Sequence, residues 1–239
     1  MNEFFNRLFT KGEVAYINFL RERIESKKKL IIITANTEIF ISGLDDEKIR
    51  NMLLDEKVSI VPDGISLVHY AKKYNIEIEE RIPGVDLCIN LFRIAQNLKL
   101  KLFLYGSKRE VIKKTVDSIK KQYPNIKIVG AINGFENNKK AVVQKIKKAK
   151  PDICLVALGC PKQEKFIYKN LEPLKSGIFI GVGGSLDVIS GYKRRAPKIL
   201  IKLHLEWLYR IIREPKRIQR FVNYNLRFIR QVRKDNKLI

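Results

Sequence analysis

The stretch LVALGCPKQEKFIYKNLEPLKSGIFIGVGGSLDVISGYKRR, residues 155–195, decides the predicted fold. Two apolar runs, residues 153–158 and 178–182, each lead into a glycine-bearing turn and then into a segment compatible with a helix. Short apolar runs bounded by glycine are typical of buried strands, and strands that alternate with helices indicate βα units. The stretch therefore predicts two strand-to-helix corners of an open parallel sheet.

Corners of this kind bind ligands in open parallel sheets, because exposed backbone N–H groups and the helix dipole both favour anions there. Gly181, Gly183 and Gly184 allow the backbone to approach a ligand closely. Asp187 follows with a carboxylate that can accept hydrogen bonds from ribose hydroxyls. The same glycines also fit ordinary turn chemistry, so this pattern alone leaves ligand contact open.

The alternation of strands and helices continues along the whole chain up to about residue 195. It predicts an α/β fold, Rossmann-like, with a mainly parallel sheet, right-handed crossovers and flanking helices. Further strands are predicted at residues 30–34, 57–61, 101–105 and 126–130, with helices at residues 10–27 (Thr10 as N-cap), 45–54, 65–74 and 108–122 and others that end near residues 97 and 150.

No strand is predicted after Pro197. One helix ends near Arg213, and Pro215 begins a second helix in which a basic stripe lies beside an apolar one. Such a helix either packs with a solvated outer face or lies on an anionic membrane. We therefore divide the chain into a core, residues 1–195, and a basic helical membrane-docking appendage, residues 196–239. The first helix has an apolar face of Leu203, Trp207, Leu208 and Ile211; the second has a basic stripe of Arg217, Arg220, Tyr224 and Arg227 and an apolar stripe of Ile218, Phe221, Val222 and Ile229.

Charge is the most unusual feature of the composition, at a formal net +23. Residues 193–239 contain 15 Lys and Arg against three acidic residues, a net +12, so half of the excess lies in a fifth of the chain. A segment this basic suits nucleic acid, an anionic membrane surface or a phosphorylated substrate.

The remaining composition narrows the protein class. A length of 239 residues with 45% hydrophobic residues fits one large α/β domain. Cys88, Cys154 and Cys160 have no CxxC spacing and only two histidines accompany them, which predicts no metal site and fits a reducing compartment. The sequence has no run of 18 apolar residues and no signal-peptide core near its start, so we expect a cytoplasmic protein.

Polar residues follow several predicted strands. Thr34 and Asn36 follow the first strand, Asp63 follows the second within Pro-Asp-Gly, and Arg81 precedes the next helix. Each has a structural explanation, such as a helix cap or a pair with a neighbouring acid, and a functional one, contact with a sugar or a phosphate. The loop at residues 132–135 also offers a base-stacking contact.

Seven segments, in order, resemble the WecG/TagA/CpsF glycosyltransferases, glycosyltransferase family 26. The resemblance covers roughly residues 30 to 220, and the ordered set is far more specific than any one segment. The segments are TANTE (34–38), PDGISLVHYAK (62–72), RIPGVDL (81–87), LYGS (104–107), LGCPKQEKFI (158–167), GVGGSLDVISGYKRRAP (181–197) and EWLYRIIREPKRIQR (206–220).

The resemblance implies an inverting transfer of N-acetylmannosamine from a UDP donor to the 4-hydroxyl of N-acetylglucosamine on undecaprenyl diphosphate, with UDP as product. This is a step of teichoic acid linkage-unit synthesis. It also implies an enzyme at the inner face of the cell membrane, bound peripherally, and able to form a homo-oligomer.

The resemblance also implies roles for individual residues. Asp63 matches the general base, Thr34 and Asn36 match positions that orient the sugar or the acceptor, and Arg81 matches a pocket arginine. Gln163 lies in the PKQE turn and is counted with them as a catalytic candidate.

Neither a cofactor nor a metal ion is expected, because no Asp-x-Asp pair stands where a metal-dependent transferase holds Mg²⁺. Arginines must then neutralise the leaving group, since guanidinium binds phosphate in a bidentate manner. On the family pattern these are Arg210, Arg217 and Arg220, while Gly106, Gly183, Gly184 and Asp187 are expected to contact the nucleotide.

Three other interpretations compete with this one. A related family transferase would use UDP-N-acetylmannosaminuronic acid or another UDP-sugar. A Rossmann-like nucleic-acid-binding protein would fit the basic charge, but the chain has no recognisable nucleic-acid motif, so we expect no nucleic-acid partner. A methyltransferase would place its glycine motif after the first strand, and here GVGGS follows about the sixth.

Overall fold

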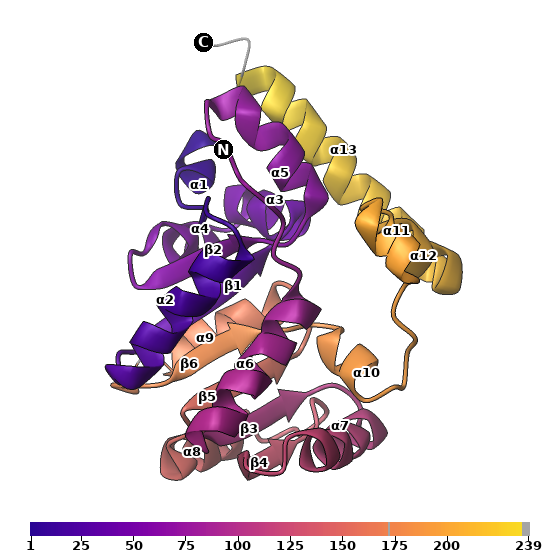
Figure 1. Ribbon diagram of the computed structural model, residues 1–239. Helices are drawn as coiled ribbons and strands as arrows, with labels where there is room; N and C mark the ends of the chain where they lie inside the picture. Colours follow the sequence, from indigo (N-terminus) through magenta and orange to yellow (C-terminus); the bar gives the residue numbers. More distant parts are fainter. Residues whose placement is uncertain (172, 236–239) are drawn as a thin grey trace.

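A parallel sheet forms the centre of the structure, a computed structural model that describes residues 1–171 and 173–235 (Figure 1). Within these residues the sheet has six strands in the order β2-β1-β6-β5-β3-β4, and every neighbouring pair is parallel. The α/β fold with a parallel sheet is therefore confirmed. The strands are β1 (Leu30–Ala35), β2 (Val58–Pro62), β3 (Lys101–Gly106), β4 (Lys127–Ile132), β5 (Ile153–Ala157) and β6 (Ile178–Gly181).

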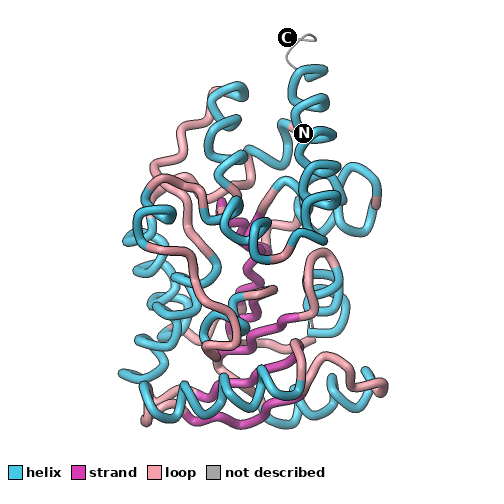
Figure 2. Tube along the Cα trace, turned by 90° about the vertical axis from the view of Figure 1, so that its right-hand side faces the viewer, coloured by secondary structure: helices cyan, strands magenta, loops and turns pink. Residues whose placement is uncertain are grey.

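Helices cover both faces of the sheet, as parallel strands require because each crossover must return the chain to the same edge (Figure 2). The helices up to β6 and just after it are α1 (Asn2–Phe5), α2 (Glu13–Glu25), α3 (Thr37–Asp45), α4 (Glu47–Leu54), α5 (Ile65–Ala71) with the 3₁₀ turn η1 (Lys72–Tyr74), α6 (Gly84–Leu98), α7 (Arg109–Gln122), α8 (Lys139–Ala149), α9 (Lys162–Leu171) and α10 (Ser185–Ile189).

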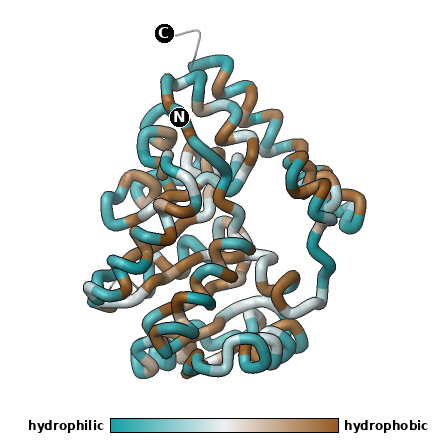
Figure 3. Tube along the Cα trace, in the orientation of Figure 1, coloured by the Kyte–Doolittle hydropathy of each residue, from teal (hydrophilic) through white to brown (hydrophobic). Residues whose placement is uncertain are grey.

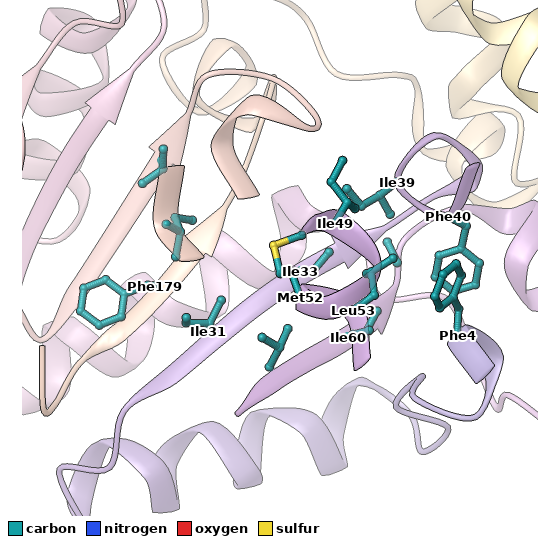
Figure 4. Packing of buried hydrophobic residues seen from close by; sticks show 14 of the residues in the cluster. Phe4, Ile31, Ile33, Ile39, Phe40, Ile49, Met52, Leu53, Ile60 and Phe179 are labelled. Carbon is teal, nitrogen blue, oxygen red and sulfur yellow. The ribbon is translucent and has the colours of Figure 1, made fainter. Parts of the chain in front are cut away.

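The core consists of two apolar clusters, one on each face of the sheet. Ile31 and Ile33 of β1 point into the cluster with α1, α3 and α4 (Figure 4). Leu30 and Ile32 belong to the cluster with α2 and α6. Successive residues of a strand face opposite sides, so a strand buried on both faces must be apolar throughout. This explains the continuous apolar runs in the sequence.

One predicted helix start was wrong, and one helix was not predicted. The first long helix begins at Glu13 after Gly12, not after Thr10, and the carboxylates of Glu79 and Glu80 accept hydrogen bonds from its first N–H groups. The helix expected to start at residue 45 is preceded by another, α3. The chain breaks between α3 and α4 at Asp46, whose side chain accepts hydrogen bonds from the N–H groups of Lys48 and Ile49.

The C-terminal segment is helical throughout most of its length. Its elements are α11 (Lys198–Lys202), α12 (Glu206–Arg213), the 3₁₀ turn η2 (Pro215–Arg217) and α13 (Ile218–Asp235). The single helix predicted to reach Arg213 is split into α11 and α12 near His204, whose φ of 58° lies in the left-handed region. The indole ring of Trp207 stacks on Phe221 at 4.9 Å between ring centroids and so joins α12 to α13.

Helix α13 packs across α3 and α5, on the side of the sheet where α1 also lies (Figure 1). Phe228 is fully buried, with its ring 6.2 Å from that of Phe5 and 5.7 Å from that of Tyr70. Val232 is buried in the same cluster. The last described helix therefore shares the apolar core of the sheet.

The predicted stripes of α13 are only partly correct, because Ile229 packs against the core but the buried residues Phe228 and Val232 lie outside the predicted apolar stripe. Arg220 and Arg227, from the basic stripe, face α3 and pair with Glu38 and Asp45. Ile218 and Val222, from the apolar stripe, are 51% and 40% exposed. Burial of Phe228 and Val232 sets the side of α13 that faces the core, and the exposed arginine pairs with α3 lie beside it.

Hydrophilic and hydrophobic residues alternate along the C-terminal helices, whereas the strands are mostly hydrophobic (Figure 3). Within residues 1–171 and 173–235, no helix is both long enough and apolar enough to cross a membrane.

Candidate active site

The carboxyl ends of the parallel strands meet at one edge of the sheet, where open α/β sheets bind ligands. The strand order places Asp63 after β2, Thr34 at the end of β1, Gly183 after β6 and Gly106 at the end of β3 along this edge. Residues far apart in the sequence thus form one row, with Asp63 near one end and Gly106 near the other.

A tight backbone turn fixes Asp63. Its N–H group and that of Gly64 both donate to the carbonyl of Ala35 at 2.9 Å. Gly84, the first residue of α6, completes the surroundings and donates its N–H to the Asp63 carboxyl. A Cβ atom on Gly84 would lie 3.5 Å from Ser185 Oγ, 3.6 Å from Thr34 Cγ2 and 3.7 Å from Asp63 Oδ2, so these side chains surround one point.

The environment of Asp63 makes it a stronger base than an ordinary aspartate. Water reaches part of the half-buried residue, yet protein surrounds the carboxyl, and this burial raises its pKa. The nearby guanidinium groups of Arg81 and Arg210 lower the pKa, and the carboxylate of Glu206 raises it. The net shift is upward, as a general base requires.

Arg81 and Arg210 come together through Glu206, a buried carboxylate in the first turn of α12. Glu206 Oε2 accepts from Arg81 Nη2 at 2.9 Å, and Oε1 accepts from Arg210 Nη2 at 2.6 Å. The two arginines hold the pKa of Glu206 below its ordinary value in spite of its burial. The site therefore combines one core arginine with one appendage arginine.

Thr34 and Asn36 occupy the adjoining corner. Thr34 Oγ1 donates to the carbonyl of Gly181 at 3.2 Å, which links β1 to β6. Asn36 Oδ1 accepts from the N–H of Ile39 at 3.1 Å and caps α3. The capping explanation for Asn36 is thus confirmed, while its contact with a sugar remains a prediction.

Gln163 joins two glycine turns. Its Oε1 accepts from the N–H of Gly159 at 3.1 Å and from that of Gly183 at 2.9 Å, and its Nε2 donates to Glu164 Oε1 at 2.8 Å. Both side chains are buried, and burial raises the pKa of Glu164 to about 7. Gln163 therefore fixes the relative position of the turns after β5 and β6.

The other end of the row contains Gly106 and Asp187. Gly106 has a φ of 122°, and a Cβ there would lie 2.3 Å from the carbonyl oxygen of Ala157, so only glycine fits. Asp187 accepts from Ser107 Oγ at 3.1 Å and pairs with Lys193 at 3.0 Å. Gly184 lies exposed just before α10.

Two predicted arginines are paired elsewhere rather than beside Asp63. Arg217 pairs with Glu214, which also binds Lys193 at 3.0 Å. Arg220 pairs with Glu38 and donates to the carbonyl of Cys160. Both arginines thus lie in the links between the C-terminal segment and the sheet edge, whereas Arg210 is the one that acts on Asp63.

Four residues of this network were not predicted from the sequence: Ser185, Lys193, Glu164 and Glu206. Glu164 and Lys193 lie inside quoted motifs, so their position next to Gln163 and Asp187 was a usable signal. Glu206 and Ser185 also lie inside quoted motifs, and Glu206 precedes Arg210 by four residues, but the pairing of Glu206 with Arg81, 125 residues away, gave no local signal.

Metal-ligating residues do not gather at this edge. In the described part of the chain, no group of three or more His, Cys, Asp or Glu side chains is arranged to hold a metal ion.

A buried carboxyl with a raised pKa beside two guanidinium groups suits proton abstraction next to a developing anion. Comparison with known proteins gives the family of the chain. A family model described as "Glycosyl transferase WecG/TagA/CpsF family" matches residues 6–238. The chain belongs to this family. The match extends beyond the motifs of residues 34–220 toward both ends, and it makes the chain a glycosyltransferase of the WecG/TagA type.

Individual relatives within the family carry a more specific name. A Bacillus subtilis strain 168 protein is 39% identical over 210 residues, 87% of this chain and 82% of its own. A Staphylococcus aureus strain MW2 protein is 35% identical over 196 residues, 82% of this chain and 77% of its own. Both are named N-acetylglucosaminyldiphosphoundecaprenol N-acetyl-beta-D-mannosaminyltransferase.

Proposed function

We propose that this protein transfers N-acetylmannosamine from UDP to the 4-hydroxyl of N-acetylglucosamine on undecaprenyl diphosphate, with inversion, as a step of teichoic acid linkage-unit synthesis. The names and identities of the two relatives support this choice of sugar and acceptor. The observation that carries the mechanism is the raised pKa of the Asp63 carboxyl beside Arg81 and Arg210.

In this proposal Asp63 acts as the general base. Its carboxylate takes the proton of the acceptor hydroxyl while the hydroxyl oxygen attacks the anomeric carbon on the face opposite to the departing UDP. Thr34 and Asn36 would orient the sugar or the acceptor from the neighbouring strand, and Gln163 would hold the glycine turns of the donor site. A base with a raised pKa accepts the proton more readily, which favours the transfer.

The departing diphosphate needs positive charge. Arg210 is the best placed arginine for the diphosphate, because its side chain is 43% exposed and its Nη2 is the group that is bound to Glu206. Arg81, Arg217 and Arg220 supply further charge, and we propose that the reaction needs no metal ion. The nucleotide would extend along the row toward Gly106, Gly183, Gly184 and Asp187, with Phe135, which is 73% exposed, as a platform for the base.

We also propose that residues 196–239 dock on the anionic inner leaflet, where the lipid-linked acceptor lies. Large apolar side chains are exposed on all three described helices of this segment, and basic residues lie among them. An apolar surface mixed with Lys and Arg binds anionic lipid interfaces. The most exposed apolar residues are Ile199 (71%), Ile212 (67%), Leu203 (60%), Ile218 (51%) and Leu226 (46%), with Lys198, Lys202, Arg213 and Lys216 among them.

The test of the transferase is UDP release by the purified protein in detergent, given UDP-N-acetylmannosamine, a short-chain lipid diphosphate N-acetylglucosamine acceptor, and a chelator. We expect release that depends on the acceptor. A panel of UDP-sugars shows whether another donor is preferred, and loss of release in the chelator would refute the metal-independent route.

Asp63→Asn keeps the shape of the side chain and removes the base, so we expect turnover to fall roughly 10² to 10⁴-fold while UDP still binds. Asp55→Asn is the matched control, because Asp55 precedes the same strand at the opposite edge of the sheet. Turnover near wild type in Asp63→Asn would exclude Asp63 as the base.

Sedimentation with phosphatidylglycerol vesicles tests the docking surface. Ile212→Glu places a charge among the exposed apolar residues and should weaken binding. Val14→Glu makes the same change at a 75% exposed residue of α2, far from the C-terminal helices in the sequence, and should leave binding unchanged. Equal binding by both variants would refute the docking surface.

A further inference from the structure

Glu206 has no role in the proposal above other than as a neighbour of two arginines, yet its position is unusual. It lies in the first turn of α12, only 4% of the residue is exposed, and both carboxylate oxygens are used. A buried carboxylate is retained in a protein when it is paired and hydrogen-bonded on both oxygens. Its two partners come from different parts of the chain.

We infer that Glu206 is a positioning residue for the transfer: it holds Arg81 and Arg210 side by side next to Asp63, and it limits how strongly their charges act on Asp63. The inference rests on the proposed function, because it assigns Glu206 a role in the reaction that uses Asp63 as base.

The geometry of Arg210 supports the inference that Glu206 holds the two arginines in place. Arg210 lies one helical turn after Glu206, at 2.6 Å from Oε1, and its side chain is 43% exposed. A guanidinium has five N–H donors in a rigid plane, so one bond to Glu206 restrains the position of the group and leaves the other donors for a phosphate. Arg81 is 10% exposed and serves as the anchor of Glu206 to the core.

The charges around Asp63 support the inference that Glu206 limits the effect of the two arginines on Asp63. Without the carboxylate of Glu206, two guanidinium groups would face one another and would have Asp63 as the nearby counter-ion. Arg81, in the loop before α6, and Arg210, on α12, act on both Asp63 and Glu206. Cys88 and the Gly84 N–H of α6 face Asp63. Arg195 acts on Glu206, and Asp86 holds its guanidinium at 2.6 and 2.7 Å.

The charge balance gives a signed prediction. Loss of the negative charge of Glu206 removes a contribution that raises the pKa of Asp63 and leaves the two arginines that lower it. The acid limb of the pH profile of kcat/KM reports the base of the free enzyme, so it should move to lower pH in Glu206→Gln. A disordered Arg210 should also lower kcat by about tenfold or more, since small misplacements have effects of that size.

Glu206→Asp separates the effect of the negative charge from the effect of the side-chain length. The shorter side chain keeps the negative charge and withdraws the oxygens from the arginines. We expect its acid limb to remain at the wild-type pH while kcat is reduced. If Glu206 served only the stability of the fold, both variants would change in stability, and the acid limb of the pH profile would not move in Glu206→Gln alone.

The experiment measures acceptor-dependent UDP release from pH 5 to pH 9 for the full chain of the wild type, Glu206→Gln, Glu206→Asp and Asp63→Asn, with circular dichroism as the check of folding. An acid limb at lower pH in Glu206→Gln supports the inference, and an unmoved limb overturns it. If Glu206→Gln does not fold, a wild-type kcat in Glu206→Asp overturns it and a reduced kcat supports it.

Failure of the proposed function can be distinguished from failure of the role of Glu206. A wild type that releases no UDP with the acceptor, or an acid limb that persists in Asp63→Asn, refutes the transferase with Asp63 as base. An active wild type whose limb depends on Asp63, with that limb unmoved in Glu206→Gln, refutes only the role of Glu206.

Discussion

Replacement of Glu164 with glutamine should change how the stability of the protein depends on pH. Glu164 is 2% exposed, and burial raises its pKa from the ordinary value of 4.5 to about 7. Its Oε1 accepts from Gln163 Nε2, and its Oε2 has no hydrogen-bond partner in the described structure. The folded state therefore disfavours the ionised form of this carboxyl.

The sign of the effect follows from proton binding. Between pH 4.5 and pH 7 the folded protein retains a proton on Glu164 that the unfolded chain has lost, so the free energy of unfolding falls as pH rises through this interval. At about 1.4 kcal/mol for each pH unit, the loss amounts to about 3 kcal/mol and is complete above pH 7. Glutamine cannot ionise, so the variant lacks this loss.

Urea denaturation followed by far-UV circular dichroism at pH 4.5, 6 and 8 gives the required free energies. The buried amide of the variant adds unpaired N–H groups that cost about 1–3 kcal/mol at every pH. The informative quantity is therefore the free energy of unfolding of Glu164→Gln minus that of the wild type at each pH. This difference should increase by about 3 kcal/mol from pH 4.5 to pH 8.

Glu110→Gln is the control, because Glu110 is exposed in the first turn of α7. Its curve should run parallel to that of the wild type. A constant difference between Glu164→Gln and the wild type across this pH range would refute the reasoning, since Glu164 would then ionise equally easily in the folded and unfolded states.

Two further predictions concern stability. Phe228→Ala should lower the free energy of unfolding by about 3–5 kcal/mol, because it empties a fully buried ring site under α13, and a urea titration with a loss below about 1 kcal/mol would contradict this. Gly106→Ala should prevent stable folding, because its Cβ would meet the Ala157 backbone at 2.3 Å, whereas Gly159→Ala, also at positive φ but with no atom within 4 Å, should cost only roughly 1–2 kcal/mol. Equal melting temperatures for the two glycine variants would refute the steric argument.

The strands could be predicted from the sequence because their signal is local. Each is a short apolar run that ends in a turn, and the observed bounds differ from the predicted ones by one or two residues. Helix α3 gave no such signal. Ile39, Phe40 and Ile41 are all buried, so the helix lacks the amphipathic period that identifies one, and only the cap at Asn36 marked its start.

The row of site residues could also be predicted, since carboxyl ends of parallel strands meet at one edge. Asp63 and Thr34 follow adjacent strands, and they do lie around the same point. The pairing of Glu206 with Arg81 could not be predicted, because it joins segments 125 residues apart and depends on how the C-terminal helices pack. The inward side of α13 could not be predicted for the same reason, because it depends on Phe228 and Val232 meeting residues of the core that are distant in the sequence.

The stacking of Trp207 on Phe221 has a spectroscopic consequence. Trp207 is the one tryptophan in the sequence, and it lies on α12 next to the buried Glu206. Tryptophan emission from the unlabelled protein therefore reports on the junction of α12 and α13. A spectral shift on addition of donor or of vesicles would locate the response at this junction, which includes the helix that carries Arg210, without the contribution of the sheet.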